Sequence, residues 1–363
     1  MHDNEEIVRN LTSHYTYKVE KAFNNSDDAS QALEVTAKSL KEIYRYFEPA
    51  FFNGDFFVCK NLGDNPCFDE KSGTLLYDKN ILLNRTDGLM IIQVFNDKGK
   101  MILWENNDPS ELFAKTDTLT YHYSANKEYF FANGQKIDLT IKNFGSRYAT
   151  QFSDLKDAIQ HYAQTKILKS TCKHFSESWA DKNRLFFRGG GRGNNIPEKF
   201  MQLSLHEYLS SYPFESRGIS MESSREYNTV GDFTHPKPVD VKLVWREANR
   251  IAIIEVKFMG SVVPDGGGKM YSHQDARANV GINDIKEYHD AASSDSPTSL
   301  IKSYLIVIDG RRNNLRKGQT TITALNGMHF KNVDIIIDDD KKFHETIQGF
   351  EKPIRIFAEP ICS

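Results

Sequence analysis

The chain has 363 residues and a formal net charge of −3, and 39% of its residues are hydrophobic. This length exceeds one average domain and predicts two, each with enough apolar residues for a core. The near-neutral balance excludes a polycationic nucleic-acid binder, so any nucleic-acid surface has to be local. The first ten residues lack the pattern of a signal peptide and no apolar run reaches membrane-spanning length, which predicts a cytoplasmic protein without membrane contact.

Helices are predicted for the first 46 residues and strands for the region that follows. Apolar residues between 33 and 44 recur at helical spacing with Ser30 as a candidate cap, and the polar cluster 24–28 divides the segment into two helices. Between 51 and 144 the period changes, and strands are expected over 88–96, 101–104, 118–123 and 135–141. The aromatic residues of this region are expected to be sheet core, with a ligand surface as the alternative: Tyr121, Tyr123, Tyr129, Phe130 and Phe131.

Cysteine usage favours reduced thiols, because Cys59 and Cys67 lack two further ligands at zinc spacing. A helix is predicted over 153–180, and a glycine-rich segment follows it, in which Arg188 and Arg192 flank three consecutive glycines. This segment is a domain linker or, alternatively, a phosphate-binding loop in which the two guanidinium groups hold an anion. Both interpretations mark a boundary, so we expect domains at 1–185 and 186–363.

A hairpin of two short apolar strands, 239–245 and 251–258, is the central feature of the C-terminal half. The second strand is apolar on both faces until Glu255, as expected for a strand that is covered on two sides. Glu255 and Lys257 share one face, and an antiparallel partner brings Asp240 alongside. Charged groups are rarely buried unless they are paired or bind a metal. A metal site is favoured over a structural ion pair, because buried ion pairs contribute little net stability.

The pattern Pro-Val-Asp240 followed by Glu255-Val256-Lys257 resembles the PD-(D/E)XK nuclease superfamily, whose fold is like that of restriction endonucleases. The resemblance covers about residues 196–309 and implies an αβββαβ core. A helix over 196–211, a strand over 218–228, the hairpin, a helix over 275–292 and a strand over 303–309 occur in that order. The expected fold is therefore mixed α/β, a nuclease core preceded by a helical and β-rich N-terminal region.

The resemblance also implies a catalytic mechanism that uses Mg²⁺, with Mn²⁺ as a substitute. Asp240 and Glu255 offer the hard oxygen ligands that Mg²⁺ prefers, and the backbone carbonyl of Val256 is the third ligand that similar enzymes use. The metal would lower the pKa of bound water and stabilise the charge of the transition state. Lys257 would orient the attacking water or stabilise the developing charge as a cation.

Further site residues follow from the neighbouring elements. An upstream helix often adds an acidic residue in similar nucleases, and Glu198, on the apolar stripe of the helix, is the candidate, with Glu207 second and a solvent-facing Glu198 as the alternative. Gln274 precedes the helix over 275–292, where similar proteins carry a polar residue near the site. Arg188, Arg192 and Gln274 are thus the candidate nucleic-acid contacts, and further basic residues follow at 311, 312, 316 and 317.

The resulting hypothesis is a Mg²⁺-dependent endonuclease that hydrolyses DNA, with RNA as the alternative substrate, in restriction or another anti-phage defence. A homodimer or a place in a defence complex accords with this role. Two alternatives stay open. One is an effector nuclease that a partner or a small ligand activates through the N-terminal region, and the other is a nucleic-acid-binding module that has lost catalysis.

Overall fold

The structure is a computed structural model of the chain. It describes residues 2–49, 52–83, 85, 87–97, 100–105, 107–125, 127–139, 144–168, 170–189, 196–212, 222–228, 238–246, 248–265 and 268–363, with backbone alone for 2–11, 146, 147, 196, 222–228 and 238. The fold is mixed α/β with two sheets in two compact units, as expected. Met1–Gln151 and the loop Arg246–Asn249 belong to the N-terminal unit, and the C-terminal unit begins at Phe152. The boundary between the two units thus lies well before residue 185, the end of the first domain that the sequence predicted.

The N-terminal unit consists of two long helices and a sheet. Its helices are α1 (His2–Ala22), α2 (Asp27–Ile43) and α3 (Ser110–Ala114), and its strands are β1 (Asn53–Asn61), β2 (Thr74–Leu75), β3 (Asp87–Val94), β4 (Met101–Trp104), β5 (Thr118–Ser124), β6 (Lys127–Ala132) and β7 (Gln135–Asp138). The expected cap at Ser30 is wrong, because α2 begins after Ser26, whose side chain accepts a hydrogen bond from the Asp28 backbone.

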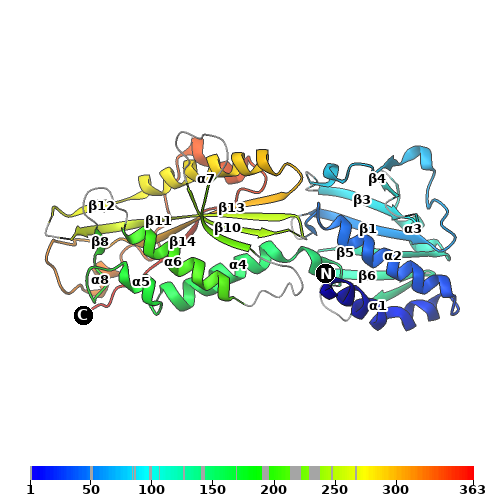
Figure 1. The fold of residues 1–363 in the computed structure, drawn as a ribbon, viewed down its shortest axis with the longest axis horizontal. Helices are drawn as coiled ribbons and strands as arrows, with labels where there is room; N and C mark the ends of the chain where they lie inside the picture. Colours follow the sequence, from blue (N-terminus) through cyan, green and yellow to red (C-terminus); the bar gives the residue numbers. More distant parts are fainter. Residues whose placement is uncertain are drawn as a thin grey trace. The chain divides into compact units, whose positions relative to one another are not determined.

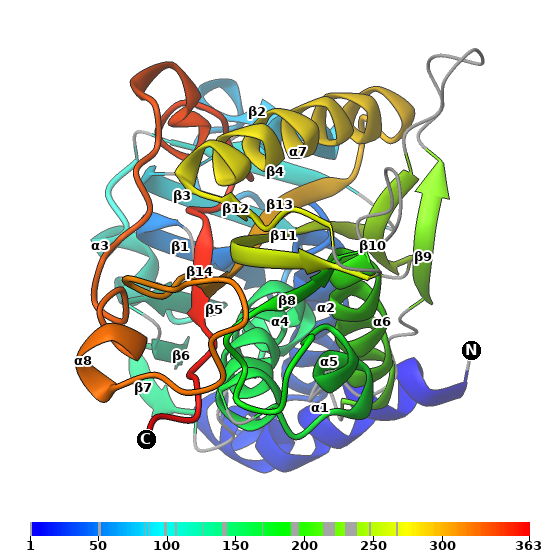
Figure 2. The ribbon, with the colours of Figure 1, turned by 90° about the vertical axis from the view of Figure 1, so that its left-hand side faces the viewer.

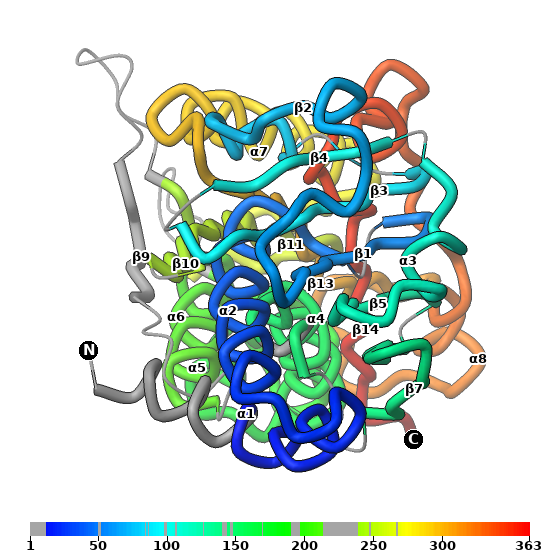
Figure 3. Tube along the Cα trace, turned by 90° about the vertical axis from the view of Figure 1, so that its right-hand side faces the viewer, coloured from blue at the N-terminus to red at the C-terminus, as the bar shows by residue number. Residues whose placement is uncertain are grey.

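The sheet of the N-terminal unit has the order β2-β4-β3-β1-β5-β6-β7, and only its β1–β3 pair is parallel. One face packs against α1 and α2 (Figures 1 and 3), where Tyr121, Tyr123 and Phe130 join the buried core. Tyr129 and Phe131 alternate to the other face and are half-buried. The core interpretation is therefore confirmed for three of these five aromatic residues. Cys59 and Cys67 are buried thiols, and the cysteines form no disulfide.

The C-terminal unit has the longest strands. Its helices are α4 (Gln151–Tyr162), α5 (Lys173–Glu177), α6 (Ile196–Ser211), α7 (Asp275–Asp295) and α8 (Ala324–Gly327), and its strands are β8 (Phe187–Gly189), β9 (Glu222–Asn228), β10 (Pro238–Trp245), β11 (Arg250–Pro264), β12 (Tyr271–His273), β13 (Leu300–Gly310) and β14 (Ile354–Phe357). The prediction of a single helix over 153–180 is wrong, because a π-helical turn at Ala163–Ile167 lies between α4 and α5.

The sheet of this unit has the order β14-β13-β11-β10-β9, and β8 and β12 both pair with the last residues of β11. β9, β10 and β11 are antiparallel, whereas β11 and β13 are parallel and are joined through α7. Helix α7 covers one face of the sheet and α6 lies on the other (Figures 1 and 2). All but the last two residues of β11 are buried, which confirms the expectation of a central strand covered on both sides.

The glycine-rich segment begins as a strand and not as a linker. Phe187 in β8 stacks on Trp179, with ring centroids 4.2 Å apart, and also contacts Phe258 of β11. These contacts fix Phe187–Gly189 in the sheet, so the linker interpretation is wrong for this part of the segment. Residues 190–195, including Arg192, lie outside the described residues. None of the helices in the described part of the chain combines the length and the apolar character that a membrane-spanning helix requires.

Candidate active site

The β10–β11 hairpin brings Asp240, Glu255 and Lys257 together, as the sequence predicts. Val241 lies opposite Ile254 in the antiparallel register, which places Asp240 beside Glu255, and Lys257 follows on the same face of β11. All three side chains are buried, with exposed fractions of 8%, 3% and 7% for Asp240, Glu255 and Lys257. Burial of three charged groups at one point of a sheet is costly and requires partners.

The two carboxylates have different partners. Asp240 accepts a hydrogen bond from the Val256 backbone N–H at 2.7 Å and another from the Gln202 side chain of α6 at 2.5 Å. Glu255 accepts a hydrogen bond from the Lys257 ammonium through Oε1. Its second oxygen, Oε2, is buried and makes no hydrogen bond to any residue in the described part of the chain. A buried carboxylate oxygen in this state lacks the cation or donor that would offset its desolvation.

Helix α7, which packs on the face of β11 that carries Lys257, adds a further carboxylate. Asp284 Oδ2 lies 3.1 Å from the Lys257 ammonium, so this cation contacts carboxylates from two elements. The approach of α7 depends on Gly281, one turn before Asp284. A Cβ atom at 281 would lie 2.7 Å from Cγ of Lys257 and 2.8 Å from Cδ1 of Leu305. Glycine therefore lets the helix backbone pack closely against the lysine stem.

Glu198 is buried in the first turn of α6 and is engaged by an arginine of α7. Nε and Nη2 of Arg277 both donate to Glu198 Oε1, at 3.1 and 2.5 Å. Glu198 is 5% exposed, so the solvent-facing alternative is wrong. Its charge still acts on the pKa values of Asp240, Glu255 and Lys257, which places it within the same electrostatic cluster.

The cluster has an excess of negative charge. Among the side chains that the structure describes, four carboxylates and two cations interact here: Glu198, Asp240, Glu255, Asp284, Lys257 and Arg277. With all of them ionised, two negative charges remain uncompensated. Burial and the neighbouring charge of Glu255 raise the pKa of Asp240 well above its usual value, and burial raises the pKa of Glu255 to about 7 despite the attraction of Lys257.

Lys257 remains charged in this environment. Burial alone would lower its pKa, but the carboxylates of Glu255, Glu198 and Asp240 outweigh that effect and raise it. The lysine is therefore a permanent cation at the site and not a proton acceptor near neutral pH. Tyr288 of α7 also keeps its proton, because burial and the charges of Glu255, Asp284 and Asp240 raise its pKa.

The donor set fits a divalent cation of the magnesium type. In the described part of the chain, no three His, Cys, Asp or Glu side chains are grouped closely enough to hold a metal by themselves. A metal here would have the carboxylates of Asp240 and Glu255 and the carbonyl of Val256 as protein ligands. Mg²⁺ suits such a set, because it usually retains several waters and accepts phosphate oxygens. The unengaged Oε2 of Glu255 and the four carboxyl groups against two cations are the observations that favour a divalent cation.

The other candidate residues lie elsewhere. Glu207, the second candidate on α6, is exposed and lies 3.3 Å from His174. Gln274 is exposed at the N-cap of α7 and its side chain caps nothing. Arg188 is half-buried and pairs opposite Val263, six residues beyond Lys257, which corresponds to about 20 Å along an extended strand. The structure therefore does not bring Arg188 to the three central residues.

The expected basic surface after β13 is wrong in part, because Arg311 and Arg312 are buried. Arg311 donates to Asp309 and also to Asp275 of α7, and Arg312 donates to the Ala358 and Arg184 carbonyls. These guanidinium groups join the C-terminal segments to the sheet. Arg316 and Lys317 remain exposed.

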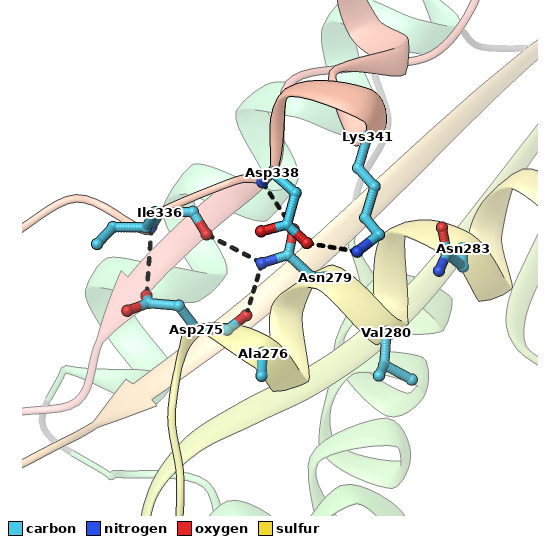
Figure 4. A pocket seen from close by; sticks show the side chains of 8 residues that line it. All are labelled: Asp275, Ala276, Asn279, Val280, Asn283, Ile336, Asp338 and Lys341. Carbon is cyan, nitrogen blue, oxygen red and sulfur yellow. Dashed lines mark hydrogen bonds and ion pairs between the residues drawn. The ribbon is translucent and has the colours of Figure 1, made fainter.

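The outer side of α7 carries a separate open cavity of about 410 Å³. Its lining comes from α7 and the segment around residues 336–341 (Figure 4). The polar groups there bind one another: Asn279 donates to the Asp275 and Ile336 carbonyls and accepts from the Asp338 backbone, and Lys341 pairs with Asp338. None of these residues belongs to the charged cluster, so this cavity is a seam between α7 and the C-terminal segment.

The sequence missed Gln202 and Asp284 as contributors to the site, and also the pairing of Arg277 with the predicted Glu198. Gln202, Asp284 and the Glu198–Arg277 pair come from helices whose orientation against the hairpin no local pattern reveals. Two signals were present: Gln202 lies one turn after Glu198, and Gly281 lies in the interior of a predicted helix, where glycine is unfavourable. Comparison of the chain with family profiles, with curated proteins and with solved structures gave no match.

Proposed function

We propose that the protein is a metal-dependent nuclease that hydrolyses phosphodiester bonds of DNA. The observation that carries this proposal is the buried group of Asp240, Glu255 and Lys257, in which Glu255 Oε2 makes no hydrogen bond to the described residues and the carboxyl groups outnumber the cations. A structural ion pair would balance its charges and satisfy its oxygens. This group does neither, which favours a cation site that acts on an anionic substrate.

The element order supports the same proposal. Helix α6, strands β9, β10 and β11, helix α7 and strand β13 follow one another as in the αβββαβ core that the sequence resemblance implies, with the short β12 added after β11. Asp240 lies near the start of β10 and Glu255 and Lys257 in the middle of β11, the positions that the D…ExK pattern requires. DNA as the substrate, and restriction or another anti-phage defence as the setting, rest on that resemblance.

Hydrolysis forms a bond between a water oxygen and phosphorus and breaks the bond to the leaving oxygen, which takes up a proton. Mg²⁺ held by Asp240, Glu255 and the Val256 carbonyl would supply Lewis acidity and neutralise phosphate charge. Lys257 contributes a fixed positive charge beside the reacting phosphate. The low exposure of the site strengthens the electrostatic interaction between that charge and the phosphate. Gln202 and the Val256 N–H hold Asp240 in one orientation.

The test is a cleavage assay on plasmid DNA, single-stranded DNA and RNA, with Mg²⁺, with Mn²⁺ and with EDTA. The wild-type protein is expected to cleave DNA only when a divalent metal is present, and Asp240→Asn is expected to remove cleavage while the protein stays folded. Asp290→Asn is the matched control, because Asp290 lies on the exposed side of α7 and pairs with Lys286. Cleavage in EDTA, or wild-type activity in Asp240→Asn, contradicts the proposal.

A further inference from the structure

The Lys257 ammonium is held between two carboxylates that belong to different elements. Glu255 is its neighbour on β11, and Asp284 reaches it from α7 at 3.1 Å. Asp284 is the more accessible of the two, with 19% of its side chain exposed against 4% for Glu255. The contact thus links the central strand to the helix that covers it.

The close approach of α7 at this point has a cost in helix stability. Glycine in a helix interior is less favourable than alanine by about 1 kcal/mol. Gly281 nevertheless occupies the second turn of α7, where any Cβ would come within 2.7 Å of the Lys257 stem. The glycine brings the helix onto the lysine and places Asp284, three residues later, at its ammonium.

The two carboxylates differ in what else they do. Glu255 is a ligand in the proposed metal site, so a bound cation would weaken the attraction between the Glu255 carboxylate and the Lys257 ammonium. Asp284 lies outside the donor set proposed for that site. We propose that Asp284 is a positioning residue, which keeps the Lys257 ammonium directed at the scissile phosphate when Glu255 is engaged by the metal. This inference rests on the proposed nuclease function and assigns a role in it to a residue outside the D…ExK pattern.

The alternatives are that Asp284 is itself a metal ligand or that it only stabilises the fold. A ligand would lose metal affinity when it is replaced. A stabilising residue would lower the unfolding temperature and would act independently of Lys257. A positioning residue acts through Lys257, so its replacement has no further effect once the lysine is absent.

The experiment is a double-mutant cycle with Asp284→Asn and Lys257→Met, in which single-turnover DNA cleavage is measured at saturating Mg²⁺ and substrate. Calorimetric Mg²⁺ affinity and the unfolding temperature are measured for each variant, and Asp290→Asn is the control. We expect Asp284→Asn to slow cleavage by about tenfold to a hundredfold, as is typical when a residue that orients another is lost. Its Mg²⁺ affinity should equal that of Asp290→Asn, Asp284→Glu should recover part of the rate, and Asp284→Asn should add nothing in the Lys257→Met background.

Several outcomes overturn the inference. Equal cleavage by Asp284→Asn and the wild-type protein removes the role, and a loss that adds to that of Lys257→Met shows that Asp284 acts independently. A tenfold or greater loss of Mg²⁺ affinity identifies Asp284 as a ligand, and a rate loss that only follows a lower unfolding temperature identifies a structural role. A wild-type protein that cleaves none of the nucleic acids overturns the proposed function and this inference together, whereas metal-dependent cleavage with any of the preceding outcomes overturns the inference alone.

Discussion

Ionisation of Glu255 in the metal-free protein opposes folding, and this effect has a measurable size. Burial raises the pKa of this carboxyl from 4.5 to about 7. A raised pKa stabilises the folded state only while the group is protonated, so this contribution is complete below pH 4.5 and is lost as the pH rises through about 7. Each factor of ten in proton affinity is worth about 1.4 kcal/mol, so the loss between pH 5 and pH 8 is on the order of 2–3 kcal/mol.

Urea unfolding of the wild-type protein and Glu255→Gln, in EDTA at pH 5 and pH 8, measures this loss of unfolding free energy. Glutamine imitates the protonated carboxyl, so the two proteins should have similar unfolding free energies at pH 5. At pH 8 the variant should be more stable by on the order of 2–3 kcal/mol, because it has no charge to bury. Titrating groups outside the cluster cancel in the comparison, whereas Asp240 adds to the difference because Glu255 acts on its pKa.

Magnesium and a surface control complete this test. At a hundred times its dissociation constant, Mg²⁺ should stabilise the wild-type protein by about 2.7 kcal/mol at pH 8. It should stabilise Glu255→Gln much less, because one ligand is missing. Asp290→Asn should follow the wild-type protein at both pH values, since Asp290 is exposed. An identical pH dependence for the wild-type protein and Glu255→Gln would refute the assignment of a buried, uncompensated carboxylate.

Two further variants probe the contacts around the site. Arg277→Gln removes the guanidinium that pairs with buried Glu198. We expect the unfolding free energy to fall by about 3 kcal/mol, as when one partner of a buried ion pair is lost. A change below about 0.5 kcal/mol, the usual range for surface substitutions, would contradict this pairing. Gly281→Ala places a methyl group against Lys257 and Leu305, and overpacking of this kind costs about 1–3 kcal/mol, offset in part by better helix propensity. In Gly281→Ala the loss of cleavage rate, expressed as a free energy, should exceed the loss of unfolding free energy. Val280→Ala, on the exposed side of the same helix, should change neither the cleavage rate nor the stability.

Elements with a strong local pattern could be predicted from the sequence. Helix α6 has the expected bounds, because Pro197 and the acidic Glu198 mark its first turn and the apolar stripe continues to its end. β10 is close to the expected strand and β11 begins where expected, because β-branched residues stand on either side of a short charged link, but β11 continues six residues past the expected end, to Pro264. The proximity of Asp240, Glu255 and Lys257 follows from the hairpin register alone.

Features that depend on distant contacts could not be predicted in this way. β8 was interpreted as a linker because three glycines follow Phe187-Arg188, yet its pairing partner, the end of β11, lies some 75 residues away in the chain. β1 and β6 were missed because each stands among polar or aromatic residues without clear alternation. Gln202 and Asp284 reach the site only through the packing of α6 and α7 on opposite faces of the sheet.

A calorimetric titration of Mg²⁺ into the metal-free protein at pH 8 tests the central claim, a divalent-cation site at Asp240 and Glu255, most directly. The account predicts one bound Mg²⁺ per chain for the wild-type protein and for Asp290→Asn. For Asp240→Asn it predicts an affinity at least about tenfold weaker, because one of two carboxylate ligands is replaced by a neutral amide. No binding to the wild-type protein, or the same affinity for wild-type protein and Asp240→Asn, would contradict the claim.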